Sequence, residues 1–395
     1  MSKTIEVSVM IDISETLYRL NPWWSAKFDL NFILRERYVS KLETSIDKKE
    51  VVFLTGLRRV GKTSLLKYLI HNLLKKVDKT KILYVPLDSI ALSEFNIHTI
   101  VEEYRKLHKI KFEEKIYLFF DEVASKKEFE RELKDFYDNE NVKIFASSSS
   151  ASLLKEKKGY LTGRVNIIEV LPLDFKEYLL FKNIKISKTD SNLYGSYFTD
   201  YMKSGGMPEY VLTGDVEYLN QLLQTIISKD IIVPNNISNE QVIRDLLKLL
   251  CERVGKTISY NKIAKILGIS LDSVRRYVSY MEDVYLFYTV DRCGKTTERI
   301  TAHKKIYIGD VGFKNIITGF RDKGAIYENL VFLKIKHEKP CYVYIDKTEL
   351  DFKFDKTIIE AKYGSPLPEN QKKLLSKFKK EGYTTKITEG YKFFL

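Results

Sequence analysis

Residues 56–63 read Gly-Leu-Arg-Arg-Val-Gly-Lys-Thr, an arrangement whose chemistry suits the binding of phosphate groups. Gly56 and Gly61 let the backbone curl so that successive N–H groups point at phosphate oxygens. Lys62 would reach the β- and γ-phosphates, and the Thr63 hydroxyl is a ligand for Mg²⁺. The spacing matches G-x-x-x-x-G-K-[ST] and predicts a nucleotide-binding loop. We expect its contact residues to be Gly56, Arg58, Arg59, Val60, Gly61, Lys62, Thr63 and Ser64.

The segments around this loop have the pattern needed to position it. An apolar run at 51–54 precedes the loop, and residues 64–70 carry apolar side chains at helical spacing. Further short apolar runs follow at 81–86, 116–120, 142–145 and 166–170. Apolar strands separated by helical stretches indicate a parallel sheet covered on both faces. We therefore predict an α/β P-loop core over residues 46–172, with the loop between its first strand and first helix.

Two acidic residues follow the apolar run 116–120. Asp121 and Glu122 would stand at the carboxyl end of that strand, which is where parallel sheets place their ligands. Asp121 would hold Mg²⁺ through water, and Glu122 would polarise the water that attacks the phosphate. The alternative is a solvated acidic loop. Beside a phosphate loop, the pair predicts hydrolysis of a nucleoside triphosphate.

Other polar residues are candidates for contacting the γ-phosphate. Ser147 stands nearest the end of the fourth strand and is our first choice for a sensor, with Ser149 second. An equal alternative is that these serines cap a helix at residues 151–154. Arg164 could act as an arginine finger on its own or a neighbouring subunit, or form a salt bridge on a loop. Arg58 and Arg59 could contact a phosphate, a lid or a nucleic acid.

The remaining chain divides into four further parts. Residues 1–45 contain the motif Asn-Pro-Trp-Trp at 21–24, and we expect this segment to pack on the core. A helical lid is predicted over 173–238, because the apolar pattern there turns helical. A helical module with its join is predicted over 239–312, and a small α/β domain over 313–395.

Residues 258–286 have the pattern of a helix-turn-helix. The first helix is expected over 261–267, and Ser270 would cap the second helix, which carries Arg275 and Arg276. These two arginines could meet DNA phosphates. The alternative is an interaction or hinge module in which the arginines are solvated.

Acidic and basic residues recur at strand spacing near the C-terminus. Glu360 and Lys362 are two apart on one expected strand and so face the same side, which Asp351 can reach from the antiparallel neighbour. Asp351 and Glu360 would bind Mg²⁺, Lys362 would activate or orient water, and Glu328 could complete the metal shell. Gln371 could help to position a substrate. The alternative is an ordinary solvated face of a small sheet.

Several segments together resemble the archaeal and bacterial AAA+-type P-loop ATPases. They are the loop at 53–63, the acidic pair, the serine run at 147–150, Leu-Thr-Gly-Arg at 161–164, Leu-Pro-Leu-Asp-Phe at 171–175, Gly-Gly-Met-Pro-Glu at 205–209 and the Asn-Pro-Trp-Trp motif. The family pattern usually has Thr-Gly-Ser where this chain has Ser147-Ser148-Ser149. The resemblance implies ATP rather than GTP, a winged-helix region after the lid and, in many members, a restriction-nuclease-like C-terminal domain. Asp351, Glu360 and Lys362 stand in the motif positions of the similar PD-(D/E)xK nuclease fold.

The composition restricts partners and compartment. The 395-residue chain has 66 Lys and Arg against 53 Asp and Glu, a net charge of +13 that favours a polyanionic partner such as DNA. Membrane association is not expected, since no stretch reaches the roughly 18 apolar residues of a span and no signal region opens the chain. Cys251, Cys293 and Cys341 are a scattered trio that indicates neither a disulfide framework nor a zinc cluster. We therefore expect a cytoplasmic protein.

These observations predict an Mg²⁺-dependent ATPase that converts ATP to ADP and phosphate. It would act as a nucleotide switch coupled to DNA binding, and its C-terminal domain could cut DNA. The second interpretation is an ATP-controlled protein-interaction or signalling scaffold with an inactive nuclease-like domain. A homo-oligomer is compatible with either.

Overall fold

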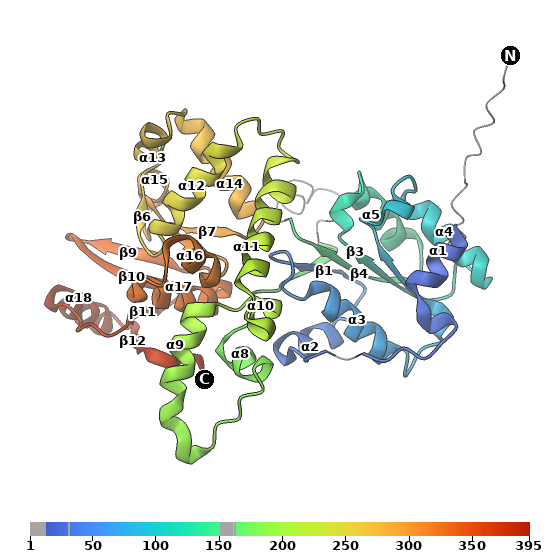
Figure 1. The fold of residues 1–395 in the computed structure, drawn as a ribbon, viewed down its shortest axis with the longest axis horizontal. Helices are drawn as coiled ribbons and strands as arrows, with labels where there is room; N and C mark the ends of the chain where they lie inside the picture. Colours follow the sequence, from blue (N-terminus) through green and yellow to red (C-terminus); the bar gives the residue numbers. More distant parts are fainter. Residues whose placement is uncertain (1–12, 31, 151–160, 162) are drawn as a thin grey trace. The chain divides into compact units, whose positions relative to one another are not determined.

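The computed structural model describes residues 13–30, 32–150, 161 and 163–395 (Figure 1). The described chain forms two compact units. The first extends to Gly56 and continues from Gly61 to Val170, and the second comprises Leu171–Leu395 together with the loop tip Leu57–Val60. The finer division into lid, helical module and C-terminal domain remains a prediction. None of the helices among these residues is both long enough and apolar enough to cross a membrane.

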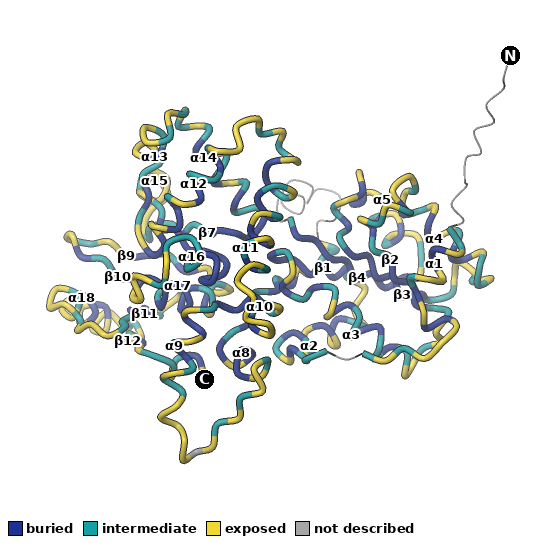
Figure 2. Tube along the Cα trace, viewed as in Figure 1, coloured by how far each residue is buried: buried dark blue, intermediate teal, exposed yellow. Residues whose placement is uncertain are grey.

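The first unit is built on a five-stranded parallel sheet, which confirms the predicted α/β class. Its strands are β1 (Val51–Thr55), β2 (Ile82–Pro86), β3 (Ile116–Asp121), β4 (Val142–Ser148) and β5 (Val165–Glu169). They lie in the order β2-β3-β4-β1-β5. β1, β3 and β4 are buried along their whole length and are dark blue in Figure 2. The ends of these three neighbouring strands therefore meet at one edge of the sheet.

Helices flank this sheet. They are α1 (Ile13–Leu20), α2 (Glu36–Glu43), α3 (Lys62–Leu73), α4 (Ile97–His108) and α5 (Phe129–Asn139). α2 and α3 lie on one side of the sheet, and α4 and α5 lie on the other (Figure 1). Trp23 and Trp24 are buried, and the indole N–H of each donates to the carbonyl oxygen of Ile82, at 3.3 and 3.0 Å. The two adjacent tryptophans thus fix the entering chain beside β2.

The second unit begins with a helical region. It contains α8 (Phe175–Phe181), α9 (Tyr194–Ser204), α10 (Pro208–Thr213), α11 (Val216–Thr225) and a π-helical segment, Ile226–Ile232. Asp310 is buried and accepts backbone hydrogen bonds from Gly206 at 2.6 Å and from Gly312 at 2.8 Å. A side chain at Gly205 would collide with this carboxyl group, since its Cβ would lie 2.2 Å from Oδ1. Asp310 therefore joins two segments that are about a hundred residues apart in the chain.

A second group of elements follows in the order α12 (Glu240–Glu252), β6 (Thr257–Ile258), α13 (Tyr260–Leu267), α14 (Leu271–Asp283), β7 (Phe287–Val290), α15 (Thr296–Thr301) and β8 (Lys304–Ile308). The three strands form an antiparallel sheet, β6-β8-β7. Ser270 caps α14 by accepting the backbone N–H of Ser273. The two helices predicted on either side of a turn at residues 268–270 are therefore present.

The chain ends in a small α/β arrangement. Its elements are α16 (Val311–Thr318), α17 (Lys323–Ile335), β9 (Cys341–Ile345), β10 (Thr348–Phe354), β11 (Thr357–Lys362), α18 (Glu369–Lys380) and β12 (Thr384–Glu389). The sheet has the order β12-β11-β10-β9, in which β11 and β12 are parallel and the other pairs are antiparallel. Apolar residues of α18 pack on the sheet next to Leu350 and Ile358. This antiparallel pairing places Asp351 and Glu360 on adjacent strands.

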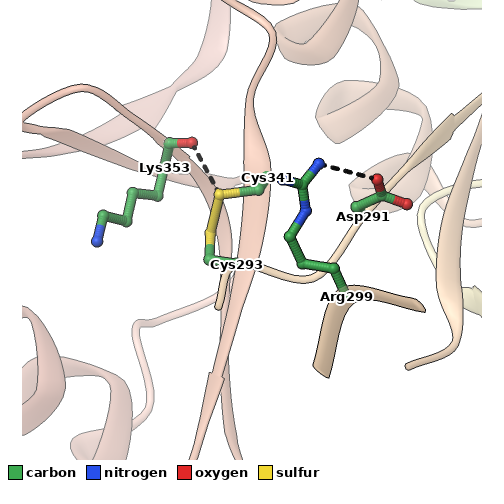
Figure 3. The surroundings of a disulfide bond; sticks show 5 residues. All are labelled: Asp291, Cys293, Arg299, Cys341 and Lys353. Carbon is green, nitrogen blue, oxygen red and sulfur yellow. Dashed lines mark hydrogen bonds and ion pairs between the residues drawn. A yellow bond between two sulfur atoms is a disulfide. The ribbon is translucent and has the colours of Figure 1, made fainter. Parts of the chain in front are cut away.

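A disulfide bond joins Cys293 and Cys341 (Figure 3). The expectation that the cysteines form no disulfide is therefore wrong. The backbone N–H of Cys293 donates to the carbonyl of Tyr342 at 2.8 Å, so the segment after β7 runs beside β9 and brings the two sulfur atoms together. The pairing spans 48 residues, and spacing in the sequence does not reveal it. Cys251 is buried and has a free thiol.

Candidate nucleotide-binding site

The loop between β1 and α3 has the backbone that a phosphate cradle requires. Gly56 has φ +133°, and a Cβ there would lie 2.2 Å from the carbonyl oxygen of Val170. Gly61 has φ +100° and precedes the first residue of α3, with open space where a Cβ would be. Both conformations are strained for residues other than glycine. The loop therefore leads the chain directly into the N-terminus of a helix, which attracts anions.

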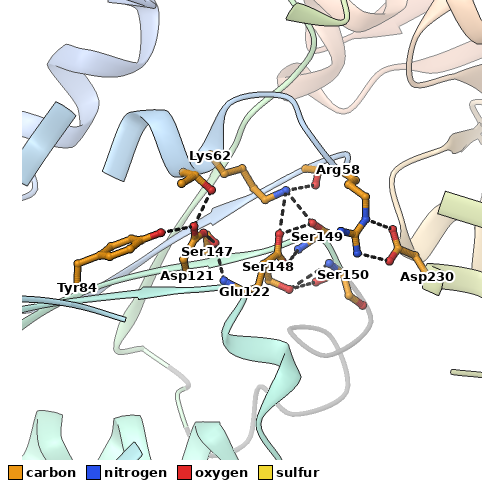
Figure 4. A network of polar contacts seen from close by, with 12 residues as sticks. Arg58, Lys62, Tyr84, Asp121, Glu122, Ser147, Ser148, Ser149, Ser150 and Asp230 are labelled. Carbon is orange, nitrogen blue, oxygen red and sulfur yellow. Dashed lines mark hydrogen bonds and ion pairs between the residues drawn. The ribbon is translucent and has the colours of Figure 1, made fainter. Parts of the chain in front are cut away.

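Lys62 points into a polar network at the end of the sheet (Figure 4). Its side chain is 4% exposed, and Nζ donates to the carbonyl oxygen of Gly56 at 3.0 Å and to Oγ of Ser149 at 2.9 Å. Oε1 of Glu122 lies 3.8 Å from the same Nζ. The ammonium group is thus held between the loop backbone and the predicted catalytic acid.

Thr63 and Asp121 meet in the same network. Oγ1 of Thr63 donates to Oδ2 of Asp121 at 2.6 Å, and the hydroxyl of Tyr84 donates to that oxygen at 3.0 Å. Ser147 Oγ donates to the other carboxylate oxygen. Burial, and then the charge of Asp121, raises the pKa of Tyr84, which keeps this hydroxyl a donor. The sequence analysis did not identify Tyr84, because an aromatic residue in an apolar strand is typical of the hydrophobic core.

Glu122 is held in an unusual conformation by two serines. Its backbone is left-handed, with φ 50° and ψ 50°, which is costly for a residue with a side chain. Its N–H donates to Ser147 Oγ at 2.9 Å, and its carboxylate accepts from Ser149 Oγ at 2.7 Å and from the backbone N–H of Ser149 at 3.2 Å. Ser147 therefore contacts both acids, whereas Ser149 links Glu122 to Lys62. The serine next to the lysine is Ser149, our second choice for the sensor.

The other residues predicted for this site make different contacts. The guanidinium group of Arg58 forms two hydrogen bonds with Asp230, at 2.9 and 2.7 Å, and that of Arg59 lies over the ring of Tyr218. Val60 is buried and Ser64 is exposed. Nε of Arg164 donates to Asp138 at 3.0 Å. Roles of Arg58, Arg59 and Arg164 at a phosphate stay predictions, as does the helix cap expected at 151–154, which lies outside the described residues.

The donor set fits ATP with Mg²⁺. Thr63 and Asp121 bring a hydroxyl and a carboxylate oxygen within 2.6 Å of each other, and oxygen donors are those that Mg²⁺ prefers. Gly61 leaves open space beside Lys62, the cation suited to phosphate oxygens. Glu122 lies next to both groups. These residues can therefore hold a metal-bound triphosphate and place a carboxylate base near it.

The two arginines predicted to meet DNA lie on an exposed face of α14. Arg275 and Arg276 are both exposed, and Nη1 of Arg275 lies 3.6 Å from the carboxylate of Asp272. The guanidinium group of Arg276 lies over the ring of Tyr277. Neither arginine is buried in a structural role, so both can reach a phosphate.

The acids predicted at the C-terminal sheet do come together. The backbone N–H of Asp351 donates to Oε2 of Glu360 at 3.1 Å, and Nζ of Lys362 lies 2.8 Å from Oε1 of Glu360. Burial, followed by repulsion from Asp351, raises the pKa of both Glu328 and Glu360 above the ordinary value for a glutamate. Gln371 donates to the carbonyl oxygen of Glu349 at 2.8 Å.

A lysine that sequence reasoning missed lies in the middle of these acids. Lys305 is buried on β8, and its Nζ contacts Glu328, Glu349 and Asp351. Although burial opposes it, the charge of Glu328 and the other acids raises the pKa of Lys305 well above its usual value. Over the described part of the chain, no three His, Cys, Asp or Glu residues are grouped to hold a metal ion. The predicted Mg²⁺ site does not fit this arrangement.

A parallel sheet whose first strand leads through such a loop into a helix defines a P-loop nucleotide-binding domain. Residues 48–179 match the family described as AAA domain, and residues 195–324 match a family described as a domain of unknown function. An uncharacterized protein of Methanocaldococcus jannaschii is 31% identical over 334 residues, which are 79% of this chain and 73% of that protein. A second uncharacterized protein of that organism is 28% identical over 78% of this chain and 69% of its own length. The chain belongs to the same family as the first of these proteins, and its P-loop domain matches the AAA domain family over residues 48–179.

Solved structures resemble the chain more distantly. The structure of AMPPCP-bound DnaA from Aquifex aeolicus is 17% identical, with a TM-score of 0.29, and the match covers 65% of this chain and 89% of that chain.

Proposed function

We propose that this protein is an Mg²⁺-dependent ATPase that hydrolyses ATP to ADP and phosphate and uses the cycle as a switch on DNA. The observation that carries the ATPase proposal is the single network joining Lys62, Thr63, Asp121 and Glu122. These four residues come from the phosphate loop and the end of β3, and the serines that join them, Ser147 and Ser149, come from the end of β4. A structural salt-bridge cluster would not also require two glycines with positive φ and a helix that begins at the lysine.

Each residue of the network has a definable task. ATP would supply the phosphoanhydride bond. Mg²⁺ would supply positive charge that offsets the negative charge of the phosphate oxygens. The loop N–H groups and Lys62 would bind the phosphate oxygens, and Thr63 with Asp121 would hold the metal. Glu122 would orient the attacking water and accept its proton. Ser149 would keep the Glu122 carboxylate beside Lys62 until a phosphate competes for the ammonium group.

Nucleotide binding tests the loop directly. Titration of a fluorescent ATP analogue with Mg²⁺ should give saturable binding by the wild type. Lys62→Ala should weaken binding at least tenfold, because the removed ammonium group bonds the phosphates. Lys76→Ala is the matched control, since Lys76 is an exposed lysine beyond the end of α3. Equal affinity in all three proteins would reject the phosphate-binding role of this loop.

The proposed DNA contact lies on the module after the lid. The order α12, β6, α13, α14, β7, α15, β8 supports a winged helix, in which the helix corresponding to α14 would enter a groove of DNA. Support comes from the exposed Arg275 and Arg276 and from the net charge of +13. In this proposal the arginines contact phosphates, so binding has little sequence preference. The predicted lid over 173–238 would transmit the nucleotide state to this module.

The second candidate function is an ATP-controlled scaffold that assembles protein partners. One observation favours an inactive C-terminal domain: Lys305 contacts the carboxylates that would hold a catalytic metal. DNA cleavage is therefore not part of the proposed function. The scaffold and DNA-switch candidates differ in salt dependence, because release of counterions from DNA phosphates gives a steep dependence of affinity on salt.

A further inference from the structure

The ammonium group of Lys305 has a complete set of carboxylate partners. Nζ lies 2.9 Å from Oε1 of Glu328, 2.7 Å from Oε1 of Glu349 and 3.1 Å from Oδ1 of Asp351, and the side chain is 1% exposed. A lysine ammonium has three N–H donors and can satisfy three acceptors. Lys305 therefore bridges three acids that come from α17 and β10.

The oxygens of the two predicted metal ligands are already engaged. Asp351 Oδ1 contacts Lys305, and Oδ2 accepts the backbone N–H of Ala361 at 2.9 Å. Oε2 of Glu360 accepts the N–H of Asp351, and Oε1 is paired with the ammonium of Lys362 at 2.8 Å without an aligned hydrogen bond. A divalent cation on these residues would have to displace an ammonium group or break a backbone hydrogen bond.

A divalent cation would compete with the Lys305 ammonium group for the same position. Mg²⁺ binds oxygen at about 2.1 Å, so an ion shared by Glu328 Oε1 and Asp351 Oδ1 would take the place of the Lys305 ammonium. Both cations cannot occupy that position, because like charges in a buried site repel strongly. Tyr307, two residues further along the same strand, donates to Glu328 Oε1 at 2.7 Å and fixes that carboxylate toward Lys305.

We propose that the Lys305 ammonium is the permanent cation of this site and stands in place of a divalent metal. The cluster then joins β8 of the three-stranded sheet to α17 and to β10 of the four-stranded sheet. It acts as a buried ionic clamp within the second unit rather than as a nuclease centre. This inference is independent of the ATPase activity proposed above.

The wild type and Asp351→Asn provide the first test. Mn²⁺ is titrated into each full-length protein by calorimetry, without nucleotide. The two titrations should be the same, because Asp351 contributes no metal site while Lys305 is present. The proposal would be overturned if the wild type bound Mn²⁺ and Asp351→Asn did not. It would also be overturned if the wild type cleaved DNA with Mg²⁺ or Mn²⁺ and Asp351→Asn did not.

Removing the lysine should convert the clamp into a metal site. Lys305→Met leaves the acids unneutralised and should lower Tm by about 10 °C in EDTA. Mn²⁺ should restore at least half of that decrease, and the double variant Lys305→Met/Asp351→Asn should show no restoration. Lys314→Met is the control, because Lys314 is a buried lysine of the same unit whose Nζ bonds Thr318 and the carbonyl of Arg321.

The metal titration and the Tm measurements each test the clamp independently. Restoration of Lys314→Met by Mn²⁺ to the same extent would show a nonspecific effect and contradict the clamp. A Tm of Lys305→Met equal to that of the wild type would also contradict it. If Lys305→Met does not fold, the comparison of the wild type with Asp351→Asn decides alone.

Discussion

Ser149 donates a 2.7 Å hydrogen bond to the carboxylate of Glu122 while its oxygen accepts from Lys62 at 2.9 Å. A serine hydroxyl can do both at once, since it has one donor and two acceptor lone pairs. The phosphate-binding lysine and the proposed base are thereby held beside each other. This single hydroxyl therefore couples the two charged groups on which ATP hydrolysis would depend.

Ser149→Ala should lower kcat for ATP hydrolysis by about tenfold and change KM for ATP much less, because it frees Glu122 from its position. Steady-state phosphate release gives both constants. Ser148→Ala is the matched control: Ser148 is a buried serine of the same run, and its hydroxyl bonds the backbone of Ser150. If Ser148→Ala were as slow as Ser149→Ala, the effect would be one of folding rather than of positioning.

The disulfide should stabilise the second unit measurably. Closing a loop between residues 48 positions apart removes chain entropy worth up to about 4 kcal/mol of unfolding free energy. Reduction should lower the unfolding free energy in urea by a large part of that amount. Cys293→Ser/Cys341→Ser should not respond to reductant. Thiol counting after denaturation should find Cys251 alone before reduction, and three free thiols at that stage would show that the bond is absent.

Asp310 should make stability depend on pH in an unusual direction. Burial raises its pKa from 3.8 to about 6, despite the two backbone N–H groups that oppose the shift. Between these values the folded state holds a proton that the unfolded state has released, so stability falls as pH rises. The shift of about two units corresponds to roughly 3 kcal/mol.

Asp310→Asn removes this titration. The unfolding free energy of the wild type, measured relative to that of the variant, should therefore be greater at pH 4 than at pH 7. Urea unfolding at the two pH values measures the difference, while other acids cancel between the two proteins. An equal difference at both pH values would show that the pKa of Asp310 is not raised on folding.

DNA affinity should depend on salt through α14. Arg275→Ala/Arg276→Ala should reduce the slope of log K against log salt by about one unit for each DNA phosphate that the arginines neutralise in the wild type. Lys75→Ala/Lys76→Ala removes the same charge from exposed positions just beyond α3 and should leave the slope unchanged. Equal slopes in the wild type and both variants would place the DNA-binding surface elsewhere on the chain.

The parallel sheet was predictable because the apolar runs in the sequence correspond directly to strands that are buried on both faces. Runs such as 116–120 are wholly apolar because both faces of the sheet are covered, and each ends where a polar residue meets the ligand edge. The loop at 56–63 was predictable for the same reason, since its glycines serve backbone conformations that no other residue adopts easily. Asp121 and Glu122 follow from their place at the strand end.

The other contacts depend on the packing of distant segments. Cys293 and Cys341 become neighbours only because the chain after β7 pairs with β9. Lys305 and Tyr307 alternate with apolar residues on β8, a faint signal that one face of the strand meets buried acids. Their partners Glu328 and Asp351 are more than 20 residues away, and no spacing rule joins them. The choice between Ser147 and Ser149 likewise needs three-dimensional distances.

The rate of ATP hydrolysis by Glu122→Gln tests the central claim most directly. The substitution keeps the size of the side chain and the ability to accept from Ser149, but it removes the base. Glu122→Gln should bind the ATP analogue with nearly wild-type affinity and release phosphate at least a hundredfold more slowly. Hydrolysis by Glu122→Gln at the wild-type rate, with normal nucleotide binding, would contradict the catalytic role assigned to this network.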